Sequence, residues 1–146
     1  MRKRTRTFTA SLLVLGGSAL LSGCAGFDAV MHKQSTSTFE DAAAFLADAQ
    51  AEVAWMPSDA TEITLRTSTL QGAADAAILF SSAATLSDEC TEVSRTSSPA
   101  WVLEGAPSPY EAETVWVCGE WSAIPTGDGW FGWAPNSDDE RRAALG

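Results

Sequence analysis

The sequence predicts an α+β fold in which one N-terminal helix packs on a mainly antiparallel sheet of about five short strands. Apolar residues recur at helical spacing in one segment, between residues 37 and 55. Beyond Pro57 they alternate with polar residues or form short runs, and Pro or Gly residues separate these runs. The chain has 146 residues, which suits one folded domain rather than two.

The N-terminal segment has the features of a secretory signal peptide. Basic residues at positions 2, 3, 4 and 6 precede an uncharged run from Phe8 to Leu21. Because a helix needs about 20 residues to cross a bilayer, a transmembrane helix is the weaker interpretation of this run. The run ends in Leu21-Ser22-Gly23-Cys24, which resembles the lipobox of bacterial lipoproteins.

This resemblance implies that the Cys24 thiol receives a lipid and that a peptidase then cuts before Cys24. Two or more acyl chains hold a protein stably at a membrane, so we expect a lipid anchor at the extracytoplasmic face of the cell membrane. Residues 1–23 would be the signal peptide, 24–36 the lipidated tether, 37–135 a small domain and 136–146 an acidic disordered tail. Ordinary cleavage after Ala25, with Cys24 unmodified, is the alternative.

The charge of the chain excludes one class of partner. The formal net charge is −10, and the signal peptide holds four of the nine basic residues and none of the nineteen acidic ones. The secreted part is therefore still more acidic, and such a surface repels nucleic acid and anionic lipid head groups. We expect no nucleic-acid partner, and we expect the covalent lipid alone to hold the protein at the membrane.

Two cysteines, Cys90 and Cys118, remain once Cys24 carries a lipid. Exported proteins enter an oxidising compartment, so we expect a disulfide between them, which stabilises the fold by roughly 3 to 4 kcal/mol. A thiol nucleophile or a metal ligand is the competing interpretation. It lacks partners, because the single histidine, His32, lies in the tether and the sequence contains no CxxC motif.

The expected elements follow in order along the chain. Ser37 and Glu40 match a capping box, which predicts a helix from there to about Trp55, ended by Pro57. Its apolar stripe would consist of Phe39, Ala42, Leu46, Ala49 and Val53. Strand-like segments lie at 62–67, 76–81, 114–118, 120–124 and 130–133, with a shorter candidate at 101–103 and a helical turn within 86–93.

Five of the six tryptophans lie in the C-terminal half of the chain. A turn at 127–129 predicts a hairpin, and pairing Pro125 with Trp130 would put Trp121 and Trp130 on one face with Ala123 and Gly132. Flat rings beside small residues can stack a sugar ring or accept a peptide, so Trp121 and Trp130 are the predicted ligand-binding residues. The alternative is that these rings cover the sheet and the disulfide as core.

No set of residues commits the domain to a reaction, a cofactor or a metal ion. We predict a non-enzymatic binding or accessory module of the cell envelope, with a glycan or an envelope protein as its partner. Segments 57–61, 118–121 and 128–133 resemble small actinobacterial lipoproteins of no assigned function. One alternative is a cell-wall glycan hydrolase or accessory enzyme, for which Glu120 and Asp128 could supply the carboxylate pair. The other is a structural or immunity-type lipoprotein.

Overall fold

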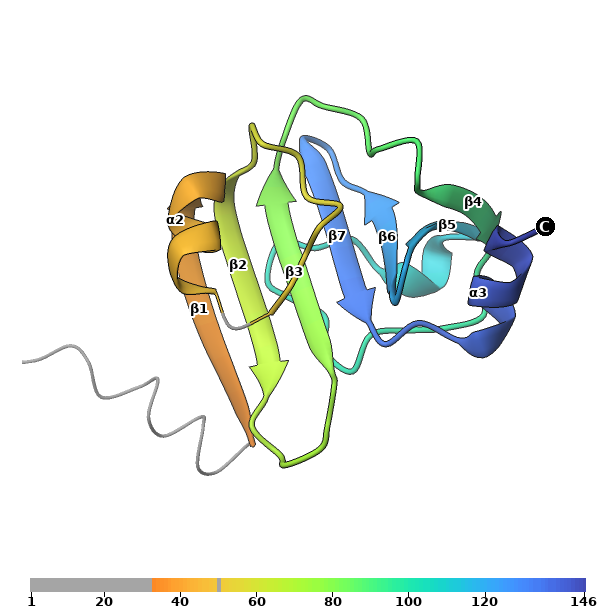
Figure 1. Cartoon of the computed structure of the whole chain (residues 1–146), viewed down its shortest axis with the longest axis horizontal. Coiled ribbons are helices and arrows are strands. Elements are labelled where there is room, and N and C mark those ends of the chain that lie inside the picture. Colours follow the sequence, from red (N-terminus) through yellow and green to blue (C-terminus); the bar gives the residue numbers. More distant parts are fainter. Residues whose placement is uncertain (1–32, 50) are drawn as a thin grey trace, which may run out of the picture.

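The computed structural model of the protein describes residues 33–49 and 51–146. In that part of the chain, seven strands form one antiparallel sheet: β1 (Gln34–Asp41), β2 (Thr61–Ser68), β3 (Ala76–Ser81), β4 (Thr91–Ser94), β5 (Thr114–Cys118), β6 (Trp121–Pro125) and β7 (Gly129–Ala134). The order across the sheet is β1-β2-β3-β7-β6-β5-β4, so β7 is central and β1 and β4 are the edges (Figure 1).

Two short α-helices and one 3₁₀ turn complete the described fold. Helix α2 (Ala42–Asp48) packs on β1 and β2, and α3 (Asp138–Ala144) packs on β4 and β5, at the opposite end of the sheet (Figure 1). The 3₁₀ turn η1 (Pro109–Glu111) lies in the long connection between β4 and β5. The expected mainly antiparallel sheet, with helix and one disulfide, is confirmed.

The sheet has more strands than the sequence predicted. Strands β1 and β4 were not expected, and the candidate strand at 101–103 is a loop. The segment 86–93, expected to be a helical turn, is a tight turn that leads into β4. Strand β4 has four residues, of which only Val93 is buried. A segment this short shows no detectable alternation of apolar and polar residues in the sequence.

The predicted N-terminal helix is wrong in its start and its length. Residues 34–41 form β1, so Ser37 is a strand residue and not a helix cap. The helix begins one turn later, where Asp41 Oδ1 accepts a hydrogen bond from the Ala44 backbone N–H (2.8 Å). It ends at Asp48, well before Trp55. The run of Ser and Thr before Phe39 favours a strand, because these residues have poor helix propensity.

The predicted disordered tail is also wrong, because most of segment 136–146 forms α3. Ser137 caps the helix by accepting a hydrogen bond from the Glu140 backbone N–H (3.1 Å). Acidic residues occupy its first turn and Arg141 and Arg142 its last, the distribution that the helix dipole favours. The charges that suggested a solvated tail therefore stabilise a short helix.

Both faces of the sheet are buried, each by a different part of the chain. We call the two sides the Trp55 face and the Trp133 face. The Trp55 face is covered by α2 and the segment 51–60, which supply Phe45, Val53 and Trp55. The Trp133 face is covered by the connection after β4 and by α3, which supply Leu103 and Ala144. Each side chain of the central strands therefore packs into one of two cores.

Candidate functional site

The β6–β7 hairpin has the register that its turn predicted. Pro125 pairs with Trp130 and Ala123 with Gly132, so Trp121 and Trp130 lie on the same face, the Trp55 face. The small residues between them were expected to admit a ligand. The structure places these two tryptophans at opposite ends of the hairpin, with the small residues in the middle.

The middle of this hairpin face is filled by the chain itself. A Cβ atom on Gly132 would lie 2.6 Å from Cζ2 of Trp55, so the Trp55 ring rests directly on the glycine backbone. Ring centroids lie 5.5 Å apart for Trp55 and Phe80, and 6.0 Å apart for Trp55 and Trp121. The glycine did signal a close approach, as expected, but the approaching group is Trp55 rather than a ligand.

Trp121 is a core residue with one edge at the surface. Its side chain is 8% exposed, and its indole N–H donates a hydrogen bond to the backbone oxygen of Glu52 (3.2 Å). That bond ties the covering segment 51–60 to the sheet. Trp130 is half-buried, packs edge-on against Trp116 at 6.5 Å, and donates its N–H to Ala84 O (3.3 Å).

Trp130 lines an open hollow of about 680 Å³, which we call the polar cleft. Its walls carry hydroxyl, carboxylate and small side chains: Asp59, Thr61, Ser81, Ser82, Ala83, Ala84, Thr85, Thr126, Gly127, Asp128, Gly129 and Trp130. The Trp121 ring is not among them. The two predicted ligand-binding tryptophans therefore belong to different hollows.

Hydrogen bonds orient the carboxylates of the polar cleft. Ser82 Oγ donates to Asp59 Oδ1 (2.5 Å), and the Ala83 backbone N–H donates to Asp59 Oδ2 (3.2 Å). The bond from Ser82 and those from backbone N–H groups hold the pKa of Asp59 below its usual value, so Asp59 is ionised at neutral pH. Ser81 Oγ lies 3.1 Å from Asp128 Oδ2 and 3.3 Å from Glu62 Oε2.

Trp121 lines a second hollow, of about 330 Å³, which we call the disulfide cavity. The predicted bond between Cys90 and Cys118 is present, with an S–S distance of 2.02 Å and Cα atoms 4.4 Å apart. Both cysteines line the cavity, whose full lining is Glu52, Ala54, Trp55, Ser87, Glu89, Cys90, Cys118, Gly119, Glu120 and Trp121.

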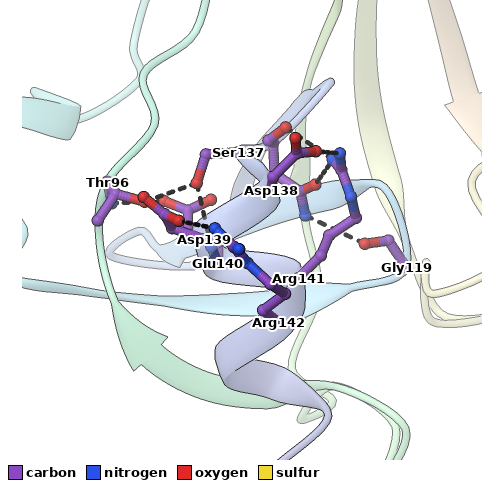
Figure 2. Close-up of polar contacts among 9 residues, drawn as sticks. Thr96, Gly119, Ser137, Asp138, Asp139, Glu140, Arg141 and Arg142 are labelled. Carbon is purple, nitrogen blue, oxygen red and sulfur yellow. Dashed lines mark hydrogen bonds and ion pairs between the residues drawn. The ribbon is translucent and has the colours of Figure 1, made fainter.

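Among the residues that the structure describes, Glu140 is the most deeply buried charged group, and its role was not predicted from the sequence. Its side chain is fully buried and accepts four hydrogen bonds: from Thr96 N and Ser97 N to Oε1 (both 2.6 Å), and from Ser97 Oγ (2.7 Å) and Ser122 Oγ (2.6 Å) to Oε2. Figure 2 shows Glu140 on the side of α3 that faces Thr96. Because its side chain is fully buried and both oxygens accept two hydrogen bonds each, Glu140 holds the fold together rather than contacting a ligand.

The alternative carboxylate pair is not brought together. Glu120 lines the disulfide cavity, whereas Asp128 lies in the hairpin turn at the polar cleft. Within residues 33–49 and 51–146, no three His, Cys, Asp or Glu side chains are grouped so that they could hold a metal ion. Over the same residues, no helix has the length and apolar composition needed to cross a membrane. Cys24 and His32 lie outside the described residues.

Comparison with the profiles of known protein families, with curated proteins and with solved structures finds no match to this chain.

Proposed function

We propose that the protein is a lipid-anchored, extracytoplasmic, non-enzymatic module that binds a glycan of the cell envelope in the polar cleft. The lipobox at Leu21-Ser22-Gly23-Cys24 supports the anchor and the address. The Cys90–Cys118 disulfide supports the same address independently, because such bonds form and persist in oxidising compartments outside the cytoplasm.

The single observation that carries the binding role is the composition of the polar cleft around the half-buried Trp130. Sugars present hydroxyl groups around their rings and apolar C–H groups on their faces. A tryptophan ring packs against the C–H face, and serine, threonine and aspartate side chains exchange hydrogen bonds with the hydroxyl groups. Hydrogen bonds within the cleft already fix Asp59 and Asp128, so little side-chain freedom is lost when a ligand binds.

The anchor is tested by metabolic labelling with a fatty-acid analogue. We expect the wild type to take up label and to sediment with membranes, and Cys24→Ala to do neither, since an acidic domain does not bind anionic membranes by itself. Equal labelling of the two proteins would contradict the lipid anchor.

The binding role is tested by co-sedimentation with isolated insoluble cell-wall glycan. We expect Trp130→Ala to reduce the bound fraction at least tenfold. The control is Tyr110→Ala, which removes an aromatic ring that is 67% exposed and lies outside the polar cleft. If both variants bind like the wild type, or if the wild type does not bind, the glycan proposal is wrong.

A further inference from the structure

The disulfide cavity has an apolar, aromatic floor. Trp55, Trp121, Cys90 and Cys118 line it, and each is between 6% and 8% exposed, so only a small part of each residue reaches the surface. Apolar and aromatic side chains of this kind take up the apolar part of a small ligand. A volume of about 330 Å³ matches the lower end of the range for small-molecule sites.

The rim of the cavity carries three exposed carboxylates, from Glu52, Glu89 and Glu120. Within the described ranges, none of these carboxylates takes part in a hydrogen bond or an ion pair. No lysine or arginine is among the residues that line the cavity in this part of the chain. Three uncompensated negative charges around one concave site attract a cation more strongly than the same charges on a flat surface.

The segments that carry the carboxylates are held in place by other bonds. The Trp121 indole N–H holds the backbone of Glu52 (3.2 Å). Asn136 braces the β5–β6 turn: its side chain donates to Gly119 O (3.1 Å) and Trp121 O (2.9 Å), and its backbone N–H donates to Glu120 O (2.9 Å). Glu89 precedes a disulfide-bonded cysteine. The rim is therefore organised before a ligand arrives.

A second, independent feature beside the cavity also indicates a ligand. The indole Nε1 of Trp55 is buried and has no hydrogen-bond partner in the described structure, although the side chain is only 6% exposed. Trp121, its neighbour across the floor, has its Nε1 satisfied. Buried polar groups without partners are uncommon, and because Trp55 lines the cavity, a ligand bound there is the available source of an oxygen acceptor.

We propose that the disulfide cavity binds an organic cation: an ammonium group on a short apolar stem with an oxygen acceptor close by. The stem would contact Trp55 and Trp121, and the ammonium group would lie among the rim carboxylates. Such a cation is either a free amine or the lysine side chain of a basic peptide. This site is separate from the polar cleft, so the inference goes beyond the proposed glycan binding.

The first test titrates the folded protein with choline, a quaternary ammonium ion with a hydroxyl group, and follows the indole N–H signals by NMR. We expect the Trp55 and Trp121 signals to shift and the Trp101 signal, from a residue on the Trp133 face, to stay in place. The uncharged analogue 3,3-dimethylbutanol has the same shape and should bind at least tenfold more weakly. Equal binding of the two compounds would overturn the role of charge.

The second test compares two triple variants that change the charge equally. Glu52→Gln/Glu89→Gln/Glu120→Gln alters the rim, and Glu104→Gln/Glu111→Gln/Glu113→Gln alters exposed carboxylates outside the cavity. We expect at least tenfold weaker choline binding for the rim variant and unchanged binding for the control. If the two variants bind choline with equal affinity, the attraction comes from net charge alone and the proposed site is wrong.

The source of the cation is identified by repeating the titration with Nα-acetyl-lysine amide and with a lysine-containing peptide. Binding of the peptide with little binding of choline indicates a basic protein partner, and the reverse indicates a free amine. If no cation binds, the proposal is overturned. Trp130→Ala should retain cation binding, so failure of the glycan proposal and failure of this one are distinguishable.

Discussion

At the scale of single residues, the contact between Gly132 and Trp55 decides what the hairpin face can do. The sequence showed that a strand glycine sits between two tryptophans, and this correctly indicated a close approach. It could not identify the approaching group, because Trp55 lies far from the hairpin in the sequence and no local pattern links the two. The same Trp55 ring also packs against Trp121, with 6.0 Å between the ring centroids.

We expect Gly132→Ala to destabilise the fold by about 1 to 3 kcal/mol, since the new Cβ atom would overlap the six-membered ring of Trp55. Trp55→Phe removes the overlapping Cζ2 and Cη2 atoms of the indole. In the Trp55→Phe background, the same glycine substitution should therefore cost less. Urea denaturation of the four proteins of this double-mutant cycle measures the coupling, and additive effects would contradict the contact.

Substitution of the two hairpin tryptophans should separate core from surface. Trp121→Ala removes a ring that is 8% exposed and a hydrogen bond to Glu52, so we expect a loss of about 3 to 5 kcal/mol in the free energy of unfolding. Trp130→Ala removes a half-buried ring at the rim of the polar cleft and should cost clearly less. Thermal denaturation followed by circular dichroism ranks the two, and equal losses would mean that Trp130 is core.

At the scale of secondary-structure elements, the sequence located the strands that have internal alternation or a clear turn. Strands β2, β3, β5, β6 and β7 were each expected within about two residues of their bounds. Strand β1 was missed because Phe39, Ala42 and Leu46 imitate a helical stripe. In the structure, Phe39 packs on Phe45 from the strand (5.2 Å between ring centroids), whereas Leu46 is 79% exposed.

Helix α3 was missed for a different reason, which is that its docking depends on one buried carboxylate. Helix α3 has seven residues, and Ala144 is its one apolar contact with the core. Such a segment shows no detectable helical periodicity of apolar residues. Glu140 attaches the helix through Ser97, Thr96 and Ser122, which come from two other parts of the chain. No sequence pattern distinguishes this glutamate from the solvated acidic residues beside it.

The docking of α3 should depend on pH. Burial alone would raise the pKa of Glu140, but the hydrogen bonds from Ser122, Ser97 and the Thr96 backbone outweigh it, so the pKa lies below its ordinary value of 4.5. A carboxylate with a lowered pKa in the folded state contributes stability above its unfolded pKa, and this is lost as the pH falls through the folded pKa. We therefore expect the wild type to lose stability below about pH 4.5.

The variant Glu140→Gln isolates this contribution. It should be less stable than the wild type at pH 7, and the difference should shrink as the pH falls through the lowered pKa of Glu140 in the folded state, where the wild-type carboxyl becomes protonated. Glu104→Gln, at an exposed position, is the matched control. Guanidinium denaturation at several pH values gives both curves, and a constant difference between wild type and Glu140→Gln would contradict the assignment.

At the scale of the whole molecule, the two edge strands of the sheet are stabilised to different extents. Seven of the eight residues of strand β1 pair with β2, whereas β4 has four residues and pairs only with β5. The Cys90–Cys118 bond joins the residue before β4 to the last residue of β5, and α3 packs on both strands. The covalent bond and the Glu140 contacts therefore secure the same weak edge.

Because of this arrangement, we expect loss of the disulfide to destabilise the β4 edge first. The variant Cys90→Ala/Cys118→Ala should lower the free energy of unfolding by roughly 3 to 4 kcal/mol on the chain-entropy model for a loop of this size. Hydrogen exchange should speed up in β4 and α3 more than in β2 and β3, because the segments with the least support have the smallest free energy of local opening. Reductant should reproduce the effect in the wild type and leave the double variant unchanged. If exchange rises uniformly over all seven strands, the bond stabilises the sheet as one cooperative unit and the edge has no separate weakness.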